Sequence, residues 1–413
     1  MKLRILFSAI VGNALEWYDY LLYAYFADIF AKLFFPTSDE YLSIMISFAA
    51  FAIGFVARPI GGLVFGYIGD RFGRKVSLTI SIILIAVPTT IMGLLPTYHQ
   101  IGIFAPILLV LMRILQGISL GGEFSASSTF LVESAPKNQQ GLYGSFSTAS
   151  IGLGMILASI MAILIHHYFS IAEIEQFAWR IPFVLSIFIG MLGIYLRSHL
   201  EESEAFKKAQ FKHKLIQKPL RTIFKNYPAN FFISCGIFMC ITIPIYSFAV
   251  YSKTIMQILN YSFADIEKYH IVILCSFMIV TPFFGYLSDK YNPKIFLMIS
   301  ALLIAFFTPL FLMALIRGGN LNLWLAFICA GAMLATFQGA MPKMIVNNFP
   351  IQVRSSGVGM SYSFTAAIFG GTAPMILNFL IKNYGLFSIF YYILFGSFAS
   401  IVALIFWGRL KRQ

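Results

Sequence analysis

Charged side chains are scarce in this sequence, and their scarcity excludes an ordinary soluble fold. Only 11% of the 413 residues are Asp, Glu, Lys or Arg, against about 25% in a typical soluble domain. Hydrophobic residues make up 59% of the chain, and the mean hydropathy is +0.83. Such a composition cannot supply a polar surface for so long a chain. The sequence therefore predicts a protein whose surface faces lipid.

The sequence also lacks the residue clusters on which most enzyme chemistry depends. It has four cysteines and six histidines, but no cysteine has the paired spacing of a metal site and no HExxH motif occurs. No loop of the form GxxxxGK[ST] is present, so nothing supports ATP as the energy source. We predict a protein that is not an enzyme and needs no metal or cofactor. A membrane enzyme or sensor is the alternative, and it would need a metal cluster, an activated nucleophile or a soluble domain.

Long apolar runs fill most of the chain, and their number predicts the fold class. A helix of about 20 residues crosses a hydrocarbon core of about 30 Å. The sequence therefore predicts an all-α polytopic membrane protein with twelve transmembrane helices. These are expected near residues 5–30, 42–69, 76–95, 102–132, 141–167, 179–198, 228–257, 266–288, 294–316, 321–349, 355–381 and 386–408.

Basic residues gather in the short segments between these runs. The chain has 29 Lys and Arg against 16 Asp and Glu, a net charge of +13. Such an excess could serve nucleic acid, but short basic loops between apolar spans instead mark the cytoplasmic side of a membrane. The loop from Gly66 to Lys75, GYIGDRFGRK, is of this kind. With Lys2 and Arg412 near the chain ends, it predicts that both termini are cytoplasmic and that no nucleic acid is bound.

A polar, basic stretch divides the sequence into two halves. We predict an N-terminal six-helix bundle over residues 1–198, a cytoplasmic linker over 199–226 and a C-terminal six-helix bundle over 227–413. An internal repeat supports the division, because GYxxDR at 66–71 recurs as GYxxDK at 285–290. A second echo relates the proline and glycines at 136–144 to those at 350–359. Six-span halves of this kind place a substrate site near the midplane between them.

Several motifs resemble those of one transporter family. GYIGDRFGRK at 66–75, RILQG at 113–117 and GGE at 121–123 look like signatures of the major facilitator superfamily. A narrower resemblance, to the metabolite:proton symporters, covers nearly the whole chain. It rests on GNALEWYDY at 12–20, ARPIGGLVFGYIGDRFGRK at 57–75, QGISLGGEFSASS at 116–128 and WRIPF at 179–183.

This resemblance implies a proton-coupled symporter that works by alternating access. Its substrate would be a small charged metabolite, either an organic acid or a zwitterion such as proline or betaine. The proton gradient would replace a cofactor, and the partners would be that metabolite, protons and the lipid bilayer. We expect a monomer in the bacterial inner membrane, because the loops are short and no transit segment is present. The chain ends at Gln413 without the coiled-coil tail of osmosensing relatives, so osmotic regulation of that kind is not expected.

An efflux antiporter of the same fold is the main alternative. In such proteins the fifth span is expected to carry a proline within a glycine-rich signature. Residues 144–162 read GSFSTASIGLGMILASIMA and contain no proline. The sequence therefore favours import.

Ionisable residues inside membrane spans cost about 2.5–3.5 kcal/mol each at a helix centre, so they are candidates for function. Glu16 and Asp19 lie on the first predicted span, and Arg113 lies on the fourth. We hypothesise that Asp19 carries the coupling proton and that Arg113 is its alternating partner, because a nearby cation lowers the proton affinity of a carboxyl group. Glu16 is the rival carrier. A fixed interhelical pair of Asp19 and Arg113 is the purely structural alternative.

Three further cations favour a substrate that bears a carboxylate. Arg58, Lys253 and Lys343 lie in predicted spans, where a buried cation needs a compensating anion. Arg58 could instead pair with an acidic residue of the first span. Lys253 could place its ammonium group at the outer membrane surface, because its aliphatic side chain is long. Aromatic rings accept quaternary ammonium groups, although packing is their commoner role. The other candidate substrate contacts are Trp17, Tyr20, Tyr23, Gln116 and Tyr246.

The loop at 66–75 is also a candidate gate. We expect Asp70 to cap a helix end or to meet a cation of the neighbouring bundle, and so to hold the outward-open state. Simple marking of the cytoplasmic side by the basic residues is the alternative. The candidate gating residues are Gly66, Asp70, Arg71, Gly73, Arg74 and Lys75, with Glu123 and Glu133 at the inner gate.

Overall fold

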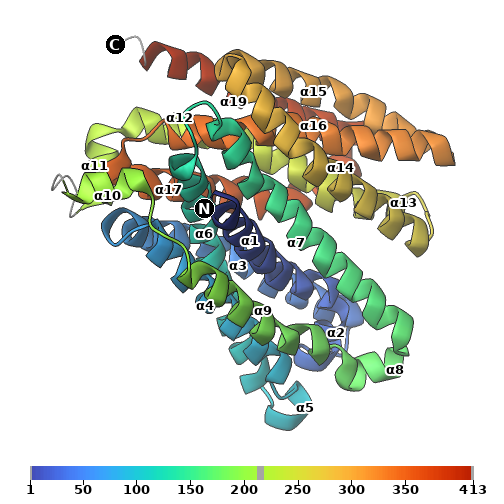
Figure 1. Ribbon diagram of the computed structural model, residues 1–413. Helices are drawn as coiled ribbons and strands as arrows, with labels where there is room; N and C mark the ends of the chain where they lie inside the picture. The colour runs from blue at the N-terminus through green and yellow to red at the C-terminus, as the bar shows by residue number, and fades with distance from the viewer. Residues whose placement is uncertain (1, 212–217, 411–413) are drawn as a thin grey trace.

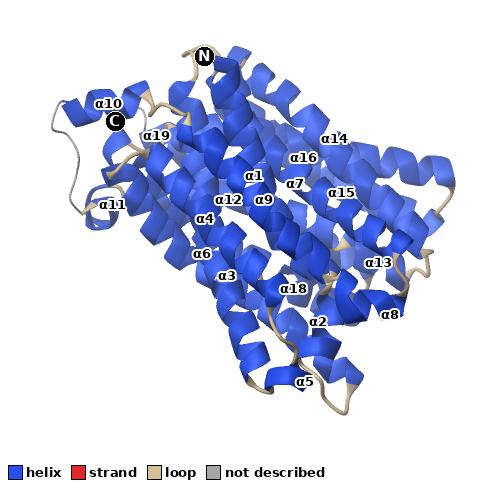
Figure 2. Ribbon diagram, turned by 60° about the horizontal axis from the view of Figure 1, so that its bottom comes forward, coloured by secondary structure: helices blue, strands red, loops and turns tan. Residues whose placement is uncertain are grey.

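The computed structural model describes residues 2–211 and 218–410, and every regular element within them is a helix (Figure 2). Lys212 and Lys214 of the predicted linker lie outside the described residues. So do Arg412 and the side chain of Lys2, on which the orientation of the termini was argued. That orientation stays a prediction.

The helices follow one another with short connections. Those of the N-terminal half are α1 Lys2–Tyr25, α2 Ala27–Phe34, α3 Glu40–Arg71, α4 Arg74–Leu94, α5 Tyr98–Ile101, α6 Phe104–Ser134, α7 Gln140–Tyr168, α8 Ile171–Glu173, η1 Ile174–Ala178 and α9 Arg180–Ser198. Two short helices, α10 Glu204–Phe211 and α11 Pro219–Asn226, lie between the halves. Those of the C-terminal half are α12 Pro228–Ile245, η2 Tyr246–Val250, α13 Ser252–Ile258, α14 Phe263–Lys290, α15 Pro293–Arg317, α16 Asn320–Val346, η3 Ile351–Val353, α17 Arg354–Thr365, η4 Ala366–Gly370, α18 Ala373–Tyr384, η5 Leu386–Ser388 and α19 Ile389–Leu410.

The predicted twelve-helix membrane fold is confirmed. Within the described residues, eleven helical stretches are long and apolar enough to cross a membrane, with mean hydropathies of 1.6 to 2.6. The remaining span is α1, whose apolar run is interrupted by Asn13, Glu16 and Asp19. The prediction of one helix over 5–30 was inexact here, because the helix breaks at Phe26 and α2 continues to Phe34. Large apolar side chains are exposed along the outside of the bundle, where lipid would cover them.

The two halves form neighbouring bundles, coloured blue to green and yellow to red in Figure 1. Two groups of helices join them: α3 and α6 pack against α17, and α7 packs against α14 and α16. The beginning of α1 and the end of α19 lie at the same end of the molecule as α10 and α11 (Figures 1 and 2). We call this the loop end, because it also holds the turn between α3 and α4. The helices α2, α5, α8 and α13 lie at the opposite end.

Glycines allow α3 and α6 to approach within the N-terminal bundle. A Cβ added at Gly61, Gly117 or Gly121 would collide with a backbone carbonyl oxygen of the facing helix. In lipid, where packing rather than hydrophobicity brings helices together, small residues at such contacts let the backbones meet. This pair of helices carries Arg58 and Arg113 and fixes their relative position.

Two helices of the C-terminal bundle are interrupted by π-helical turns. Tyr246–Val250 separates α12 from α13, and Ala366–Gly370 separates α17 from α18. Pro244 lies just before the first break, where its missing N–H removes a helical hydrogen bond. A Cβ on Gly370 would lie 2.6 Å from the ring of Tyr246, so the two breaks are in contact. Such turns often mark functional sites in helices.

Candidate functional site

The guanidinium group of Arg58 lies fully buried on α3 and is surrounded by aromatic rings. Its central carbon lies 5.4 Å from the ring centre of Trp17, 4.9 Å from that of Tyr20 and 4.3 Å from that of Phe55. Its three nitrogens make no hydrogen bond of ordinary geometry among the described residues, and the phenol groups of Tyr246 and Tyr362 are the polar side chains that approach them. The phenol group of Tyr246 faces Arg58 from the C-terminal half. Neither acidic residue of α1 pairs with Arg58, so the alternative of an internal ion pair is not realised.

Arg113 on α6 is a second buried cation beside Arg58. Its guanidinium carbon lies 4.5 Å from the ring centre of Tyr20 and 4.6 Å from that of Tyr23, so Tyr20 separates the two arginines. It donates hydrogen bonds to Gln116 Oε1 at 2.6 Å and to the carbonyl oxygen of Tyr20 at 3.3 Å. No carboxylate forms an ion pair with either arginine among the residues that the structure describes. Two positive charges thus share a low-dielectric site, a costly arrangement without an anion.

The other predicted substrate contacts divide into two groups. Trp17, Tyr20 and Tyr246 surround Arg58. Gln116 lies further inside the N-terminal bundle, where it accepts from Arg113 and donates to Thr89 Oγ1 at 2.6 Å. The hydroxyl of Tyr23 is likewise bonded within that bundle, to the carbonyl oxygen of Ser47 at 3.1 Å. Gln116 and Tyr23 therefore position Arg113 rather than line an open surface.

Asp19 does not contact Arg113 in this conformation. It is buried, and its Oδ1 accepts a hydrogen bond of 2.5 Å from the hydroxyl of Ser186 on α9. The fixed interhelical pair considered from the sequence is therefore absent here. The role of Asp19 as proton carrier stays a proposal.

A second charged cluster, formed by Glu16, Glu123 and Arg197, was missed in the sequence. Arg197 near the end of α9 donates to Glu123 Oε1. The hydroxyl of Ser81 donates to Glu123 Oε2 at 2.5 Å. Glu16 Oε1 lies in hydrogen-bond contact with the hydroxyl of Ser119. Glu123 thus lies in this cluster inside the N-terminal bundle, and its expected role at the inner gate stays a prediction.

One sequence signal for Arg197 was present but not interpreted. A Cβ on Gly12 would overlap the Arg197 guanidinium group, so only glycine leaves room for it there. Gly12 begins the GNALEWYDY motif. Arg197 itself looked like an ordinary basic residue at the end of a span.

Asp70 connects the two bundles at the loop end. Its Oδ1 and Oδ2 accept hydrogen bonds of 2.9 Å from the backbone N–H groups of Ser355 and Ser356, at the beginning of α17. A carboxylate is favoured at a helix N-terminus, where N–H groups lack partners. Gly66 allows this contact, because a Cβ there would lie 2.6 Å from the Cα of Ser356.

Arg74 and Glu133 extend this contact into a network. Arg74 lies 3.6 Å from Asp70 and 3.1 Å from Glu133, and Arg354 of α17 lies 3.0 Å from the same Glu133 oxygen. The hydroxyl of Ser203 also donates to Glu133, at 2.7 Å. The network is almost completely buried and ties α3, α4 and α6 to the C-terminal bundle.

The remaining residues of the loop hold its shape. Gly73 has a φ of +110°, which side chains other than glycine rarely adopt. The backbone N–H of Lys75 donates to Glu202 Oε2 at 3.0 Å, and its ammonium group donates to the carbonyl oxygen of Ser198 at 2.8 Å. The Arg71 side chain is exposed and donates to the hydroxyl of Tyr67.

Asp289 makes the matching contact in the other half of the repeat. It accepts from the N–H groups of Gly141 and Leu142 at 2.8 and 2.9 Å, at the beginning of α7. Lys343 of α16 lies 2.8 Å from Asp289. Its expected anion is thus a residue of the protein, which removes the reason for expecting a substrate carboxylate there, and Lys343 as a substrate contact stays a prediction. Each repeated aspartate binds one of the helix starts that carry the second sequence echo.

Lys253 lies at the opposite end of the molecule and is also paired. Its ammonium group lies 2.6 Å from Glu267 Oε1 and 4.6 Å from the ring centre of Tyr25 on α1. The hydroxyl of Ser159 on α7 donates to Glu267 at 3.3 Å. The two bundles therefore also meet at this end, and the reason for expecting a substrate carboxylate at Lys253 is removed.

Comparisons with known proteins agree with this architecture. The family model described as "Sugar (and other) transporter" matches residues 5–228, and the model described as "Major Facilitator Superfamily" matches residues 245–413. The chain belongs to the major facilitator superfamily. It is 35% identical over 386 residues to a putative proline/betaine transporter of Staphylococcus aureus strain COL, covering 91% of this chain and 81% of the relative.

Two further comparisons place this major facilitator protein. It is 32% identical over 418 residues to the inner membrane metabolite transport protein YhjE of Escherichia coli K12, covering 99% of this chain and 95% of the relative. Its fold matches that of the proton:xylose symporter XylE bound to 6-bromo-6-deoxy-D-glucose, with a TM-score of 0.78, 17% identity, and coverage of 98% of this chain and 94% of that one. The two curated relatives establish a multi-pass membrane transporter with bacterial homologues.

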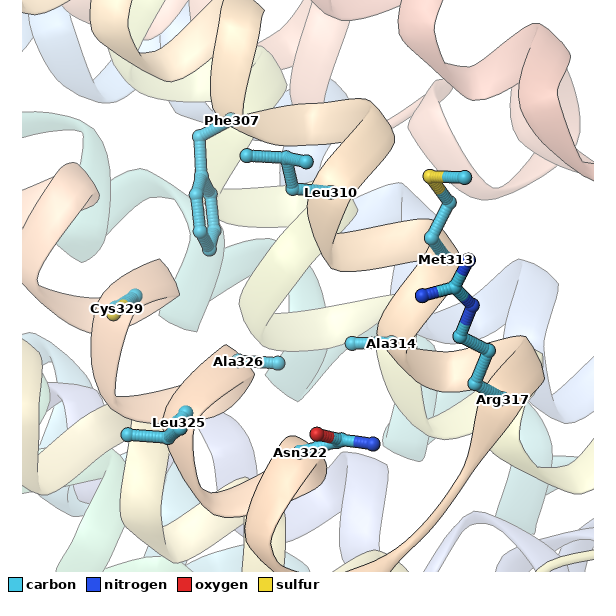
Figure 3. A pocket seen from close by; sticks show the side chains of 9 residues that line it. All are labelled: Phe307, Leu310, Met313, Ala314, Arg317, Asn322, Leu325, Ala326 and Cys329. Atoms are coloured by element: carbon cyan, nitrogen blue, oxygen red, sulfur yellow. The ribbon is translucent and has the colours of Figure 1, made fainter.

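A surface groove of this major facilitator protein lies apart from the charged sites. It has a volume of about 270 Å³ and lies between α15 and α16, with Phe307, Leu310 and Cys329 toward one side and Arg317 and Asn322 toward another (Figure 3). None of its lining residues belongs to the aromatic site, to the carboxylate cluster or to the contacts at the loop end.

Proposed function

We propose that this protein is a proton-coupled symporter that imports a small metabolite bearing a carboxylate group. The observation that carries the proposal is the pair of buried arginines, Arg58 and Arg113, on either side of Tyr20. Neither guanidinium group has a carboxylate partner among the described residues, and the polar side chains that approach Arg58 there are the phenols of Tyr246 and Tyr362. A carboxylate is the ligand that a guanidinium fork binds best.

The aromatic rings around Arg58 widen the proposed class of substrates to include zwitterions. Trp17, Tyr20 and Phe55 come from the N-terminal bundle, and Tyr246 reaches the same site from the C-terminal bundle. A substrate carboxylate at Arg58 would leave ring faces for a positively charged substrate group. A relative described as a putative proline/betaine transporter supports such a substrate. Organic acids, which carry no positive group, remain the alternative within the proposal.

Alternating access follows from the contacts at the two ends. Asp70, Asp289 and Glu133 join the bundles at the loop end, and Lys253 and Glu267 meet residues of the N-terminal bundle at the other end. Breaking one set while keeping the other would open the arginine site to one side only. In our proposal the loop end and both termini are cytoplasmic. Protons taken up by buried carboxylates of α1 drive the cycle.

The proposal can be tested by thermal unfolding of the full-length protein purified in detergent, with proline, glycine betaine, α-ketoglutarate, citrate, succinate and shikimate as ligands. A ligand present at about 100 times its dissociation constant adds about 2.7 kcal/mol to the stability of the folded state. We expect at least one carboxylate-bearing compound to stabilise the protein, and the Arg58→Gln variant to lose that effect. Arg317→Gln, in the surface groove, is the matched control and should respond as the wild-type protein does. The proposal fails if no such ligand stabilises the protein, or if Arg58→Gln responds fully.

A further inference from the structure

The cluster of Glu16, Glu123 and Arg197 has an excess of one carboxyl group over its cations. All three side chains are at most 1% exposed. With both carboxyl groups ionised, the cluster would carry one uncompensated negative charge in a region of low dielectric, which is strongly unfavourable. One bound proton removes that charge. The charge balance therefore calls for one proton, and the hydrogen bonds indicate where it lies.

Glu123 has the environment of an ionised carboxylate. Arg197 donates to one of its oxygens, and the hydroxyl of Ser81, which also lies 3.0 Å from the carbonyl oxygen of Leu78, donates to the other at 2.5 Å. Charge-assisted hydrogen bonds of this kind stabilise the ionised form. The proton is therefore not on Glu123.

Glu16 has a different environment, and the hydrogen bonds of the Ser119 hydroxyl indicate whether Glu16 is protonated. The Ser119 oxygen lies 2.6 Å from the carbonyl oxygen of Ser81 and also contacts Glu16 Oε1. A serine hydroxyl has one hydrogen, and a backbone carbonyl can only accept. If that hydrogen goes to the Ser81 carbonyl, the short contact with Glu16 needs a hydrogen from Glu16 itself. The second oxygen of Glu16 has no partner among the described residues.

We infer that Glu16 is protonated in this conformation, that it donates through the Ser119 hydroxyl to the Ser81 carbonyl, and that its proton is the one coupled to transport. The coupling role rests on the proposed function. When the proton leaves Glu16 for water, the Ser119 hydroxyl turns to donate to the new carboxylate, the Ser81 carbonyl loses that donor, and Arg197 faces two carboxylates. The charged groups that face Glu16 are Glu123 of α6 and Arg197 of α9.

The cluster is connected both to the arginine site and to the loop end. Glu16 precedes Trp17 and lies one turn before Tyr20, so a change around Glu16 acts on the helix that supplies two rings to Arg58. Arg197 directly precedes Ser198, whose carbonyl accepts from Lys75 of the 66–75 loop. Opening of the loop end would therefore displace the end of α9, which carries Arg197. Release of the proton is thereby linked to the change in access.

The first test measures the proton directly, by infrared spectroscopy of the full-length protein in lipid. A protonated carboxyl group has a C=O stretch that a carboxylate lacks. We expect Glu16→Gln to lose one such band at neutral pH, whereas Glu204→Gln, the same change at an exposed site on α10, loses none. If Glu16→Gln does not fold, Ser119→Ala serves instead, because removing the hydroxyl should shift the frequency of this band. A spectrum unchanged by the variant that folds would overturn the inference, whatever the substrate is.

The second test asks whether this proton is coupled to transport, using proteoliposomes and the ligand found by thermal unfolding. Glu16→Gln should exchange that ligand across the membrane but lose accumulation driven by a pH gradient. Accumulation that persists in Glu16→Gln would overturn the coupling role. Failure of the wild-type protein to transport the ligand would instead contradict the proposed function, while the infrared result would still stand.

Discussion

Replacing Asp70 by asparagine should shift the protein away from the conformation described above. The carboxylate accepts two backbone N–H bonds from Ser355 and Ser356, and hydrogen bonds to charged groups contribute about 1.5–3 kcal/mol each. Asparagine keeps one acceptor oxygen, turns its NH₂ group toward the other N–H, and removes the charge beside the start of α17. Loss of one bond and weakening of the other together cost about 3 kcal/mol. At about 1.4 kcal/mol per factor of ten, the balance of conformations should move about 100-fold.

Spin labels provide the assay. Phe72 and Tyr291 are exposed, and each directly follows one copy of the repeated motif, GYxxDR at 66–71 and GYxxDK at 285–290. Spin-labelled cysteines at these two positions therefore report the separation of the bundles at the loop end. With the four native cysteines replaced by alanine, we expect Asp70→Asn to populate longer distances and to slow substrate exchange, because one conformation becomes too stable. Asp28→Asn, an exposed position on α2 at the opposite end, should leave the distances unchanged.

Substrate affinity separates this explanation from its rival. Asp70 does not touch the aromatic rings around Arg58, so the intrinsic affinity should be nearly intact in Asp70→Asn. A fall in affinity with unchanged label distances would refute the reasoning. It would place Asp70 in the binding site or leave the 66–75 loop as a marker of membrane orientation only.

Three other changes test the remaining contacts. Glu133→Gln leaves two arginines without their shared carboxylate and should lower the stability of the purified protein by about 3 kcal/mol in thermal unfolding; an unchanged transition would show that the network contributes nothing. Gly121→Ala forces a methyl group against the backbone of α3 and should cost at least about 1–3 kcal/mol by the same assay, so full stability would mean that the two helices can separate. Lys253 and Glu267 are partly exposed, at 22% and 13%, so a double-mutant cycle with alanine should give a coupling of only about 1 kcal/mol. Additive effects would show that these two side chains, both of the C-terminal bundle, do not hold each other in place for their contacts with Tyr25 and Ser159.

The sequence predicted the spans well because each is a long apolar run between basic or polar segments. It located the repeated aspartates for a similar reason, since a charged motif that recurs at a fixed offset stands out in an apolar sequence. It could not reveal that Asp70 and Asp289 each reach the helix start carried by the opposite half. That pairing depends on how the bundles face each other, which no local pattern encodes.

Partners distant in sequence also explain what the sequence did not show about two charged residues. Lys343 was expected to need a substrate anion, but Asp289, 54 positions earlier, supplies one. Glu123 was expected at the inner gate, and the contact with Arg197, 74 positions away, places it in a buried cluster that the sequence did not indicate. Arg58 differs from both, because no described carboxylate approaches it. A buried cation therefore indicates a ligand only when no carboxylate of the folded protein pairs with it.

The close contact of α3 with α6 has a counterpart in the C-terminal bundle, where a Cβ on Gly331 or Gly339 of α16 would meet a carbonyl oxygen of α14. Helices whose backbones meet through glycine cannot slide without collision, so the part of the protein that carries both arginines should move as one rigid body. The π-helical turns at Tyr246–Val250 and Ala366–Gly370 lie on α12–α13 and α17–α18, outside both of these glycine contacts, and these segments are able to bend. Substitutions beside the glycines should then alter how tightly substrate is held, whereas substitutions at the two turns should alter how fast it is released.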